Sequence, residues 1–207
     1  MIKLIIFDLW YTLIYKKQST NTRELMYSMC PQKISLSEFS KISTTVIQTK
    51  KWNSKLEAYE ELARQSQLDK PKEIAKRWFE LRKSKDSKFL TYDYVIPLLK
   101  KLSKNYKLGL ISNCTYYSAE IMKKETSIFD YIDYEILSFQ VGLLKPDLNI
   151  FLKMLEKANV KPEEAVMIGD NINNDIIPCK ILGLNAIHFT GDSNKLKTDL
   201  INLDLKI

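Results

Sequence analysis

The sequence contains one histidine, three cysteines and five glycines in 207 residues. The cysteines, Cys30, Cys114 and Cys179, are far apart, and no CxxC motif occurs. This argues against a disulfide scaffold and a cysteine-type zinc site, and it is typical of a reducing compartment. The single His188 lies in a strand-like run, where it is expected to be a satisfied sheet residue. Histidine-based catalysis and His-rich metal sites are therefore largely excluded.

Long apolar runs and dense basic tracts are missing as well. No stretch is long enough to span a membrane, and Asp8 interrupts the N-terminal apolar run early, so no signal peptide is predicted. These features predict a cytoplasmic protein without membrane contact. The 32 Lys plus Arg exceed the 25 Asp plus Glu and give a net charge of +7, but the lysines are spread along predicted helices. They indicate a solvated surface rather than a nucleic-acid partner.

The sequence does contain a series of short apolar runs. Strands are predicted at residues 4–7, 106–111, 134–137, 165–168 and 185–189, and helical patterns separate the later ones. Strands that alternate with helices indicate βαβ units and a single parallel sheet. The predicted fold class is therefore α/β, with a Rossmann-like parallel sheet as its core.

Residues 16–90 have a different pattern, because predicted helices follow one another there with no strand among them. A capping box at residues 35–38 and a proline at position 71 mark the starts of two of these helices. We expect an all-helical subdomain over residues 16–90, inserted into a core domain made of residues 1–15 and 91–207.

Polar side chains follow three of the predicted strands. Asp8, Ser112 and Asp170 come at strand ends, and the carboxyl ends of parallel strands meet at the edge where α/β sheets bind ligands. Lys145 precedes a helix that should begin near that edge, and Asp175 follows at the start of another. Each residue alone is as well explained by a helix cap or a surface charge. Together they predict a crevice with three carboxylates, one hydroxyl and one ammonium group.

Three carboxylates at close range repel one another unless a cation balances them. Because the crevice offers oxygen ligands and no His or Cys cluster, it favours a hard ion, Mg²⁺, held with waters and a substrate phosphate. Ser112, Lys145 and backbone N–H groups would then bind phosphate oxygens. Asp8 could act as a nucleophile that forms a covalent aspartyl-phosphate.

Four segments resemble, in order, the motifs of the haloacid dehalogenase-like (HAD) hydrolase superfamily: residues 7–13 (FDLWYTL), 110–113 (LISN), 141–147 (VGLLKPD) and 168–175 (IGDNINND). By these motifs the chain is identified as a member in which an α-helical cap, here residues 16–90, is inserted after the first motif. The resemblance implies a Mg²⁺-dependent phosphatase or phosphotransferase whose partner is a small molecule, a phosphorylated metabolite.

The resemblance also implies roles for single residues in catalysis and metal binding. Asp8 would be the nucleophile and a metal ligand, Trp10 would offer its backbone carbonyl to Mg²⁺, and Asp170 would be a further ligand. Asp175 would bind the metal or support its ligands, and Thr12 of the first motif is a further catalytic candidate.

Phosphate binding would fall to a second group of residues. Ser112 and Lys145 are the principal candidates and also count as catalytic residues. Leu9 and Asn113, which stand beside the nucleophile and beside Ser112 in the sequence, complete this group.

Trp10 departs from the pattern of the family's phosphatases, which usually carry a second aspartate at this position as general acid–base. Tryptophan cannot donate a proton usefully, and general acid catalysis is worth about 10²–10⁴-fold. Aryl or acyl phosphates, whose leaving groups need little protonation, should therefore be better substrates than alkyl phosphates.

Alternatives stay open because of Trp10. The family's 2-haloacid dehalogenases also lack the second aspartate, and they use no metal. However, they typically lose the counterpart of Asp170, which is present here. They also use a cap arginine, for which Arg23 is no convincing equivalent. A phosphonate-cleaving hydrolase would need a cap lysine that the sequence does not single out. The last alternative is a regulatory or phosphate-binding protein with negligible turnover.

Overall fold

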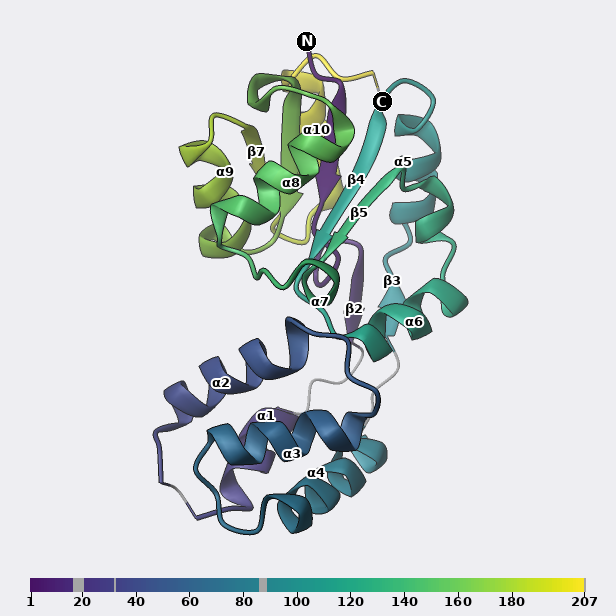
Figure 1. Cartoon of the computed structure of the whole chain (residues 1–207). Coiled ribbons are helices and arrows are strands. Elements are labelled where there is room, and N and C mark those ends of the chain that lie inside the picture. Colours follow the sequence, from purple (N-terminus) through teal and green to yellow (C-terminus); the bar gives the residue numbers. More distant parts are fainter. Residues whose placement is uncertain (17–20, 32, 86–88, 207) are drawn as a thin grey trace.

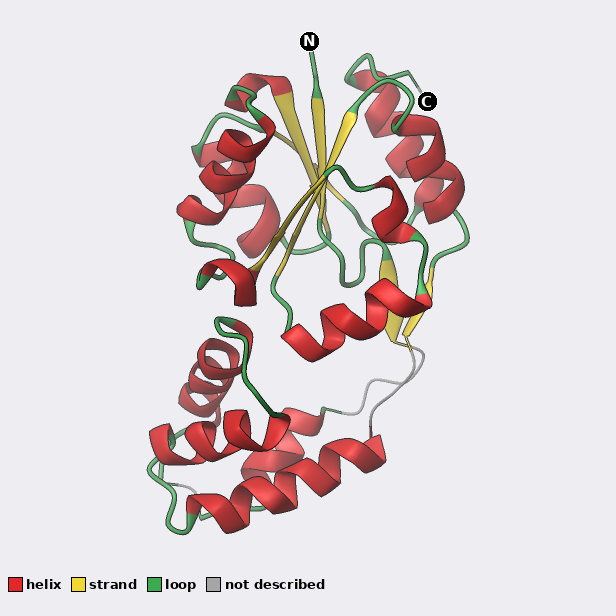
Figure 2. Cartoon of the chain, turned by 45° about the vertical axis from the view of Figure 1, so that its right-hand side comes forward, coloured by secondary structure: helices red, strands yellow, loops and turns green. Residues whose placement is uncertain are grey.

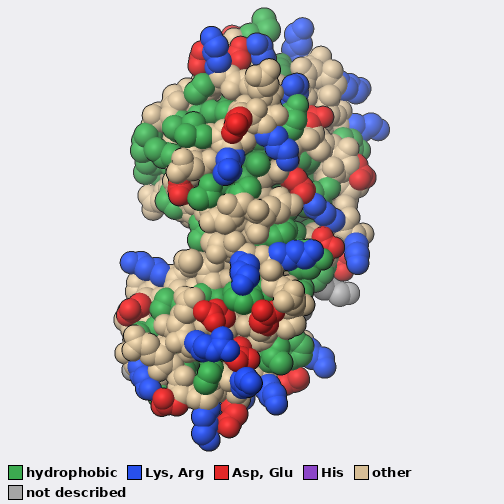
Figure 3. Space-filling view, viewed as in Figure 1, with side chains coloured by type: hydrophobic (Ala, Val, Ile, Leu, Met, Phe, Trp, Pro, Cys, Tyr) green, Lys and Arg blue, Asp and Glu red, His purple; other side chains and the backbone are tan. Residues whose placement is uncertain are grey.

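The computed structural model describes residues 1–16, 21–31, 33–85 and 89–206. An α/β body carries a second body of four helices at one end of its sheet (Figure 1). None of the described helices has both the length and the apolar composition needed to cross a membrane. On the face shown in Figure 3, Lys and Arg side chains are interspersed with Asp and Glu. This mixture agrees with the solvated surface predicted from the spread of the lysines.

Five strands form one parallel sheet in the order β5-β4-β1-β6-β7. The central strand β1 pairs with β4 on one side and β6 on the other. The predicted α/β class with a parallel sheet is confirmed, and every strand lies within one residue of its predicted bounds. The strands are β1 (Leu4–Phe7), β4 (Lys107–Ser112), β5 (Tyr134–Leu137), β6 (Ala165–Gly169) and β7 (Asn185–His188).

Helices cover both faces of this sheet (Figure 2). Ile5 and Phe7 pack into one apolar layer with α5, α6 and α10, whereas Leu4 and Ile6 pack into the opposite layer with α8 and α9. Because successive side chains of a strand point to opposite faces, burial of both faces requires an uninterrupted apolar run. These helices are α5 (Val95–Leu102), α6 (Tyr116–Glu125), α8 (Leu148–Ala158), α9 (Ile177–Ile181) and α10 (Ser193–Asn202).

Short helical elements precede or follow some of the strands. The helix expected to begin near Asp175 consists of two parts, a π-helix at Ile172–Ile176 and then α9. The chain leaves this helix through Gly183, whose φ of +82° favours glycine. The others are α7 (Ser138–Val141) and the 3₁₀ helices Ile128–Tyr131 and Pro162–Glu164.

The four-helix body has an apolar core of its own, in which Phe39, Leu62 and Trp78 are fully buried. The indole Nε1 of Trp78 donates a hydrogen bond to the carbonyl oxygen of Met26 (2.8 Å), so α4 is fastened to α1. Ser35 and Ser54 cap α2 and α3 through their hydroxyls, as helix N-caps commonly do. The helices are α1 (Thr22–Ser28), α2 (Leu36–Gln48), α3 (Lys55–Gln65) and α4 (Pro71–Lys85).

Two short strands, β2 (Ile14–Lys16) and β3 (Phe89–Thr91), connect the bodies as an antiparallel ribbon. The expectation of no strand within residues 16–90 is therefore wrong at its two ends. The strands are separated by more than seventy residues and form because each satisfies the other's backbone groups, which no local pattern reveals. Residues 17–20, 32 and 86–88 of the predicted helical stretch lie outside the described residues.

Candidate active site

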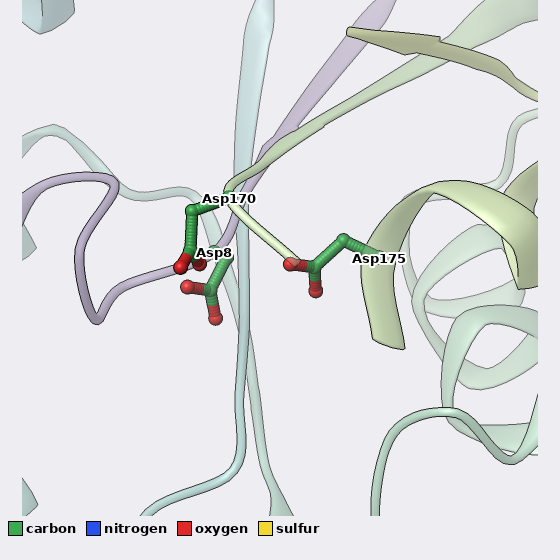
Figure 4. Close-up of side chains that lie close together, drawn as sticks. All are labelled: Asp8, Asp170 and Asp175. Atoms are coloured by element: carbon green, nitrogen blue, oxygen red, sulfur yellow. The ribbon is translucent and has the colours of Figure 1, made fainter. Parts of the chain in front are cut away.

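Three adjacent strands bring the predicted polar residues to one edge of the sheet. Asp8 follows β1, Ser112 ends β4 and Asp170 follows β6, and the backbone N–H of Asp8 donates to the carbonyl oxygen of Ile168 (2.9 Å). Asp175 reaches the same place from the π-helix. One carboxylate oxygen from each of the three aspartates lies within 4.8 Å of the others, and Figure 4 shows the three carboxylates converging.

Lys145 lies between two of these carboxylates. Its Nζ is 2.5 Å from Asp8 Oδ1 and 2.5 Å from Asp175 Oδ1. The exposed fractions of Asp8, Lys145 and Asp175 are 5%, 6% and 1%, so these charges have little contact with water. Three carboxylates and one ammonium leave two negative charges when all groups are ionised, which is the charge that a divalent cation neutralises.

The pKa values show how strongly burial acts on this cluster. Burial raises the pKa of Asp8 to about 7, with Lys145 opposing the shift and Asp175 adding to it. Burial and then the charge of Asp175 also raise the pKa of Asp170. For Lys145, burial disfavours the ammonium, but the two adjacent carboxylates outweigh it and raise the pKa. Lys145 therefore stays charged, and the carboxylates still favour a further cation.

Asn113 holds Lys145 in place through its side-chain amide. The amide Nδ2 donates to the carbonyl oxygen of Lys145 (2.9 Å), and the backbone N–H of Lys145 donates to Asn113 Oδ1 (2.8 Å). This pair of hydrogen bonds joins the end of β4 to the loop before α8. The side chain of Asn113 is thus engaged, so the phosphate contact predicted for this residue would have to come from its backbone.

Two buried hydroxyls, on residues close in sequence to Asp8 and to Asn113, are unsatisfied. Thr12 and Ser112 are fully buried, and neither hydroxyl oxygen has a hydrogen-bond partner among the described residues. A buried hydroxyl without a partner costs about 1–3 kcal/mol. Leu9 is also fully buried, and its backbone hydrogen bond favours the carboxylate form of Asp8. Hydroxyls in this position fit a ligand that accepts hydrogen bonds, as phosphate oxygens do.

Trp10 makes aromatic contacts to the connecting ribbon. Its ring lies edge-on against Phe89 of β3, with 6.4 Å between the ring centroids, and Lys16 Nζ of β2 is 5.4 Å from the centre of the Trp10 ring. The position that carries an acid in the family's phosphatases is therefore filled by an aromatic ring that contacts Phe89 of β3 and the ammonium of Lys16 of β2.

A cavity of about 750 Å³ lies between the two bodies. Trp10 and Asn113, neighbours of Asp8 and Ser112, line it from the sheet side, and residues of α1, α2, α3 and α4 line it from the helical side. The cavity is large enough for a small molecule, and its wall includes residues next to Asp8 and Ser112 in the sequence, although the carboxylates themselves do not line it.

The sequence pattern gave no role to Gly169 and no hydrogen-bond partner to His188. A Cβ atom at position 169 would lie 2.5 Å from Asp175 Cγ, so only glycine lets this carboxylate lie across the end of β6. His188 is 2.9 Å, through Nε2, from the carbonyl oxygen of Asp170, which satisfies the ring as predicted and fixes the backbone of Asp170. The Gly169-Asp170 pair in the sequence could have indicated that glycine is needed there. The partner of His188 could not be inferred in this way, because His188 lies on β7 and Asp170 follows β6.

Replacing Gly169 by alanine is expected to displace Asp175 and to lower turnover by about 10²-fold, the effect of misplacing a catalytic group by about 1 Å. Steady-state kinetics of the Gly169→Ala variant on an aryl phosphate would measure this. The control is Gly109→Ala on β4, where the added Cβ would be crowded by the flexible side chain of Met154 at 3.0 Å and would lie at ordinary contact distance, 3.5 Å, from Ile6. Equal turnover in both variants would contradict a role for the Gly169–Asp175 contact.

Comparison with protein families finds a match over residues 5–189 to the model described as haloacid dehalogenase-like hydrolase. Among curated proteins, a glyceraldehyde 3-phosphate phosphatase from Methanothermobacter thermautotrophicus is 32% identical over 97 residues, 47% of this chain and 43% of that protein. A pyrimidine 5′-nucleotidase from Escherichia coli is 33% identical over 92 residues, 44% of this chain and 39% of that protein. The chain thus matches less than half the length of these relatives.

Solved structures with the same fold cover almost the whole chain. An HAD family enzyme from Bacteroides thetaiotaomicron, in complex with magnesium and inorganic phosphate, is 22% identical to this chain with a TM-score of 0.67. The match covers 95% of this chain and 99% of that enzyme's chain. A 2-haloacid dehalogenase from Pseudomonas syringae is 22% identical to this chain with a TM-score of 0.61. That match covers 91% of this chain and 86% of the dehalogenase chain. At these identities the likeness concerns the fold.

Proposed function

Because the chain belongs to the haloacid dehalogenase-like hydrolase family, we propose that it is a Mg²⁺-dependent phosphatase or phosphotransferase that acts through an aspartyl-phosphate on Asp8. The observation that carries this proposal is the buried cluster in which Asp8, Asp170 and Asp175 surround a space at the sheet edge with Lys145. Phosphatases among the similar curated proteins support it.

The donor set suits Mg²⁺. All side-chain donors are carboxylate oxygens, the preferred ligands of this hard ion, and their uncompensated charge matches its own. Asp8 and Asp170 would hold the metal with the backbone carbonyl of Trp10, and Asp175 would bind it or support its ligands. Bound there, Mg²⁺ would supply positive charge against the phosphoryl oxygens.

The remaining steps would be carried out by residues of the chain. A carboxylate oxygen of Asp8 attacks the phosphorus, and the bond from phosphorus to the leaving oxygen breaks, which leaves phosphate on Asp8. Lys145 and the free hydroxyls of Ser112 and Thr12 hold the phosphoryl oxygens. Attack by water, or by an acceptor hydroxyl, then frees Asp8. Since Trp10 cannot protonate the leaving group, good leaving groups such as phenolates are favoured.

We assign the two bodies different tasks. Residues 1–15 and 91–207 would form the catalytic core domain, and residues 16–90 would form a cap that covers the site and selects the substrate. The location of the cavity between α1–α4 and the sheet edge supports this division. A small phosphorylated molecule would fit the cavity and reach the carboxylates.

The runner-up is a 2-haloacid dehalogenase, and the observation in its favour is the aromatic Trp10 next to the nucleophile. Against it, Asp170 is present and converges with Asp8 and Asp175, an arrangement that favours a bound cation, which the family's dehalogenases do not use. A catalytically weak phosphate-binding protein would keep the same cluster and would differ only in turnover.

One experiment separates these functions. The purified protein is assayed on p-nitrophenyl phosphate and on L-2-chloropropionate, each with Mg²⁺ and with EDTA. We expect phosphate release that depends on Mg²⁺ and no halide release. Halide release in EDTA would establish the dehalogenase instead. Phosphate binding without release of either product would identify the regulatory protein.

The metal site has a test that needs no turnover. Mg²⁺ is expected to raise the melting temperature of the wild-type protein, since a ligand that binds only the folded state stabilises it. Asp170→Asn should weaken Mg²⁺ binding at least about tenfold, a loss of about 1.4 kcal/mol. Asp192→Asn serves as the control, because Asp192 caps α10 and asparagine caps a helix equally well. An unchanged Mg²⁺ response in Asp170→Asn would contradict the assigned ligand.

A further inference from the structure

The cavity between the two bodies is rich in aromatic side chains. Of the 25 described residues that line it, seven are aromatic, a share more than twice the 11% of the whole sequence. Trp10, Phe89 and Tyr116 line it from the α/β body and the connecting ribbon, and Trp52 lines it from the helical body. A group that enters this space therefore meets aromatic side chains from both bodies.

Trp10 is the cavity-lining ring closest in the chain to the nucleophile. It follows Asp8 by two residues, so the Cα atoms of the two are at most about 7 Å apart. Asn113 also lines the cavity, and its amide is hydrogen-bonded to the backbone of Lys145, whose Nζ contacts Asp8. The organic group of a phosphate ester bound at Asp8 is therefore within reach of the Trp10 side of the cavity.

The ring of Trp10 is held by its neighbours while it remains only half-buried. Phe89 lies edge-on against it, with 85° between the ring planes, and Lys16 Nζ is 5.4 Å from its centre. A side chain that is already fixed in place loses little conformational freedom when a ligand binds to it. Trp10 thus offers a pre-organised aromatic surface beside the nucleophile.

Aromatic residues of the two bodies are also tied to each other at the cavity. The hydroxyl of Tyr117 on α6 donates a hydrogen bond to the carbonyl oxygen of Trp52 (3.1 Å), and Lys51 Nζ is 4.2 Å from the centre of the Tyr116 ring. Helix α6 lies at the end of the α/β body that faces the four helices (Figure 1). These contacts keep the aromatic residues from both bodies together around one space.

We propose that this cavity binds a planar aromatic ring of the substrate, with Trp10 in contact with that ring, so that the substrate is a phosphate monoester whose organic group is aromatic. Aromatic rings attract one another in offset or edge-to-face pairs, in addition to the gain from covering apolar surface. A saturated ring of the same size gains only the second of these. This substrate class rests on the proposed function of the Asp8 site, which would hold the phosphate.

Phosphonates separate binding of the ring from the ease of breaking the ester, because they have no ester oxygen to lose. Isothermal titration in Mg²⁺ compares benzylphosphonate with cyclohexylmethylphosphonate, its saturated counterpart, and with ethylphosphonate. We expect the wild type to bind benzylphosphonate about 3- to 10-fold more tightly than the cyclohexyl compound, the size of an aromatic pair contribution. Ethylphosphonate, with the least apolar surface, should bind most weakly. Equal affinities for the two ring compounds would overturn the proposal.

Variants assign this preference to Trp10. The ratio of the benzyl and cyclohexyl affinities should fall close to one in Trp10→Leu, whereas Trp10→Phe, which keeps an aromatic ring, should retain part of it. Phe129→Leu is the matched control, since Phe129 is a half-buried ring that does not line the cavity. Structural damage would lower both affinities and leave their ratio unchanged. A wild-type ratio in Trp10→Leu, or the same fall in Phe129→Leu, would overturn the assignment.

A measurement on the wild type decides the question even if Trp10→Leu does not fold. In an NMR titration, the indole N–H signal of Trp10 should shift more with benzylphosphonate than with the cyclohexyl compound, because only the first has a ring current. The signal of Trp78 should stay in place, since this indole is fully buried and bonded to the carbonyl of Met26. An unchanged Trp10 signal at saturating benzylphosphonate would contradict the contact.

Turnover of p-nitrophenyl phosphate keeps the two proposals distinguishable. Mg²⁺-dependent turnover without any preference for the aromatic phosphonate would overturn the ring subsite alone. A ring preference that depends on Trp10 in a protein without turnover would support the subsite and overturn the hydrolase.

Discussion

Replacing Asp8 by asparagine is expected to lower kcat for an aryl phosphate by at least about 10⁴-fold, because the amide cannot form the aspartyl-phosphate. The fold should survive. Asp8 is a buried carboxylate whose pKa is raised to about 7, so a neutral side chain of the same shape removes an unfavourable buried charge. Lys145 keeps its second partner, Asp175.

Steady-state kinetics and thermal unfolding of the same Asp8→Asn preparation would check both parts of this expectation. Mass spectrometry of the wild type, quenched with acid during turnover, should show one added phosphoryl group on the peptide that contains Asp8. The Asp192→Asn variant carries the same substitution on the surface and should keep wild-type turnover. Retention of most turnover by a folded Asp8→Asn protein would rule out the nucleophile assignment.

Replacing Lys145 by methionine is expected to lower the free energy of unfolding by about 3–5 kcal/mol, the cost of removing one partner from a buried ion pair. The reason is that Lys145 is the cation between Asp8 and Asp175, at 2.5 Å from each. Without it, two carboxylates remain buried and repel each other. Urea unfolding in EDTA measures the loss, and added Mg²⁺ should recover part of it by balancing the same carboxylates.

An exposed lysine provides the matched control for this variant. Lys33 forms an ion pair with Asp69 at 3.0 Å, but both side chains are largely open to solvent. Lys33→Met should therefore change the free energy of unfolding by no more than about 1 kcal/mol. The double variant Asp8→Asn/Lys145→Met should lose less stability than the sum of the single variants, since the groups are coupled. Equal losses in Lys145→Met and Lys33→Met would contradict the buried cluster.

Local sequence patterns were sufficient for the α/β core. The run Leu4–Phe7 is apolar at every position because both faces of β1 are covered by helices, and this makes a central strand recognisable. The position of Asp8, Ser112 and Asp170 after such runs predicted their meeting at one edge, since parallel strands align their carboxyl ends. The expected starts of two helices added Lys145 and Asp175, and the structure places both beside Asp8.

Only the tertiary structure showed how these groups are held. Asn113 and Lys145 are 32 residues apart, and neither residue type indicates that the amide of the first would clamp the backbone of the second. The need for glycine at position 169 follows from the path of the Asp175 side chain across β6. Such contacts depend on the relative placement of elements, and sequence periodicity describes only one element at a time.

The sequence by itself determined the sheet, the helical insertion and the identity of the residues that gather at the sheet edge, because burial and strand direction leave a local pattern. The tertiary structure decided the ribbon of β2 and β3 and the contact of Trp10 with that ribbon. Each of these joins segments far apart in the chain. Hydrogen bonding and ring packing between such segments act through space and leave no periodic trace along the sequence.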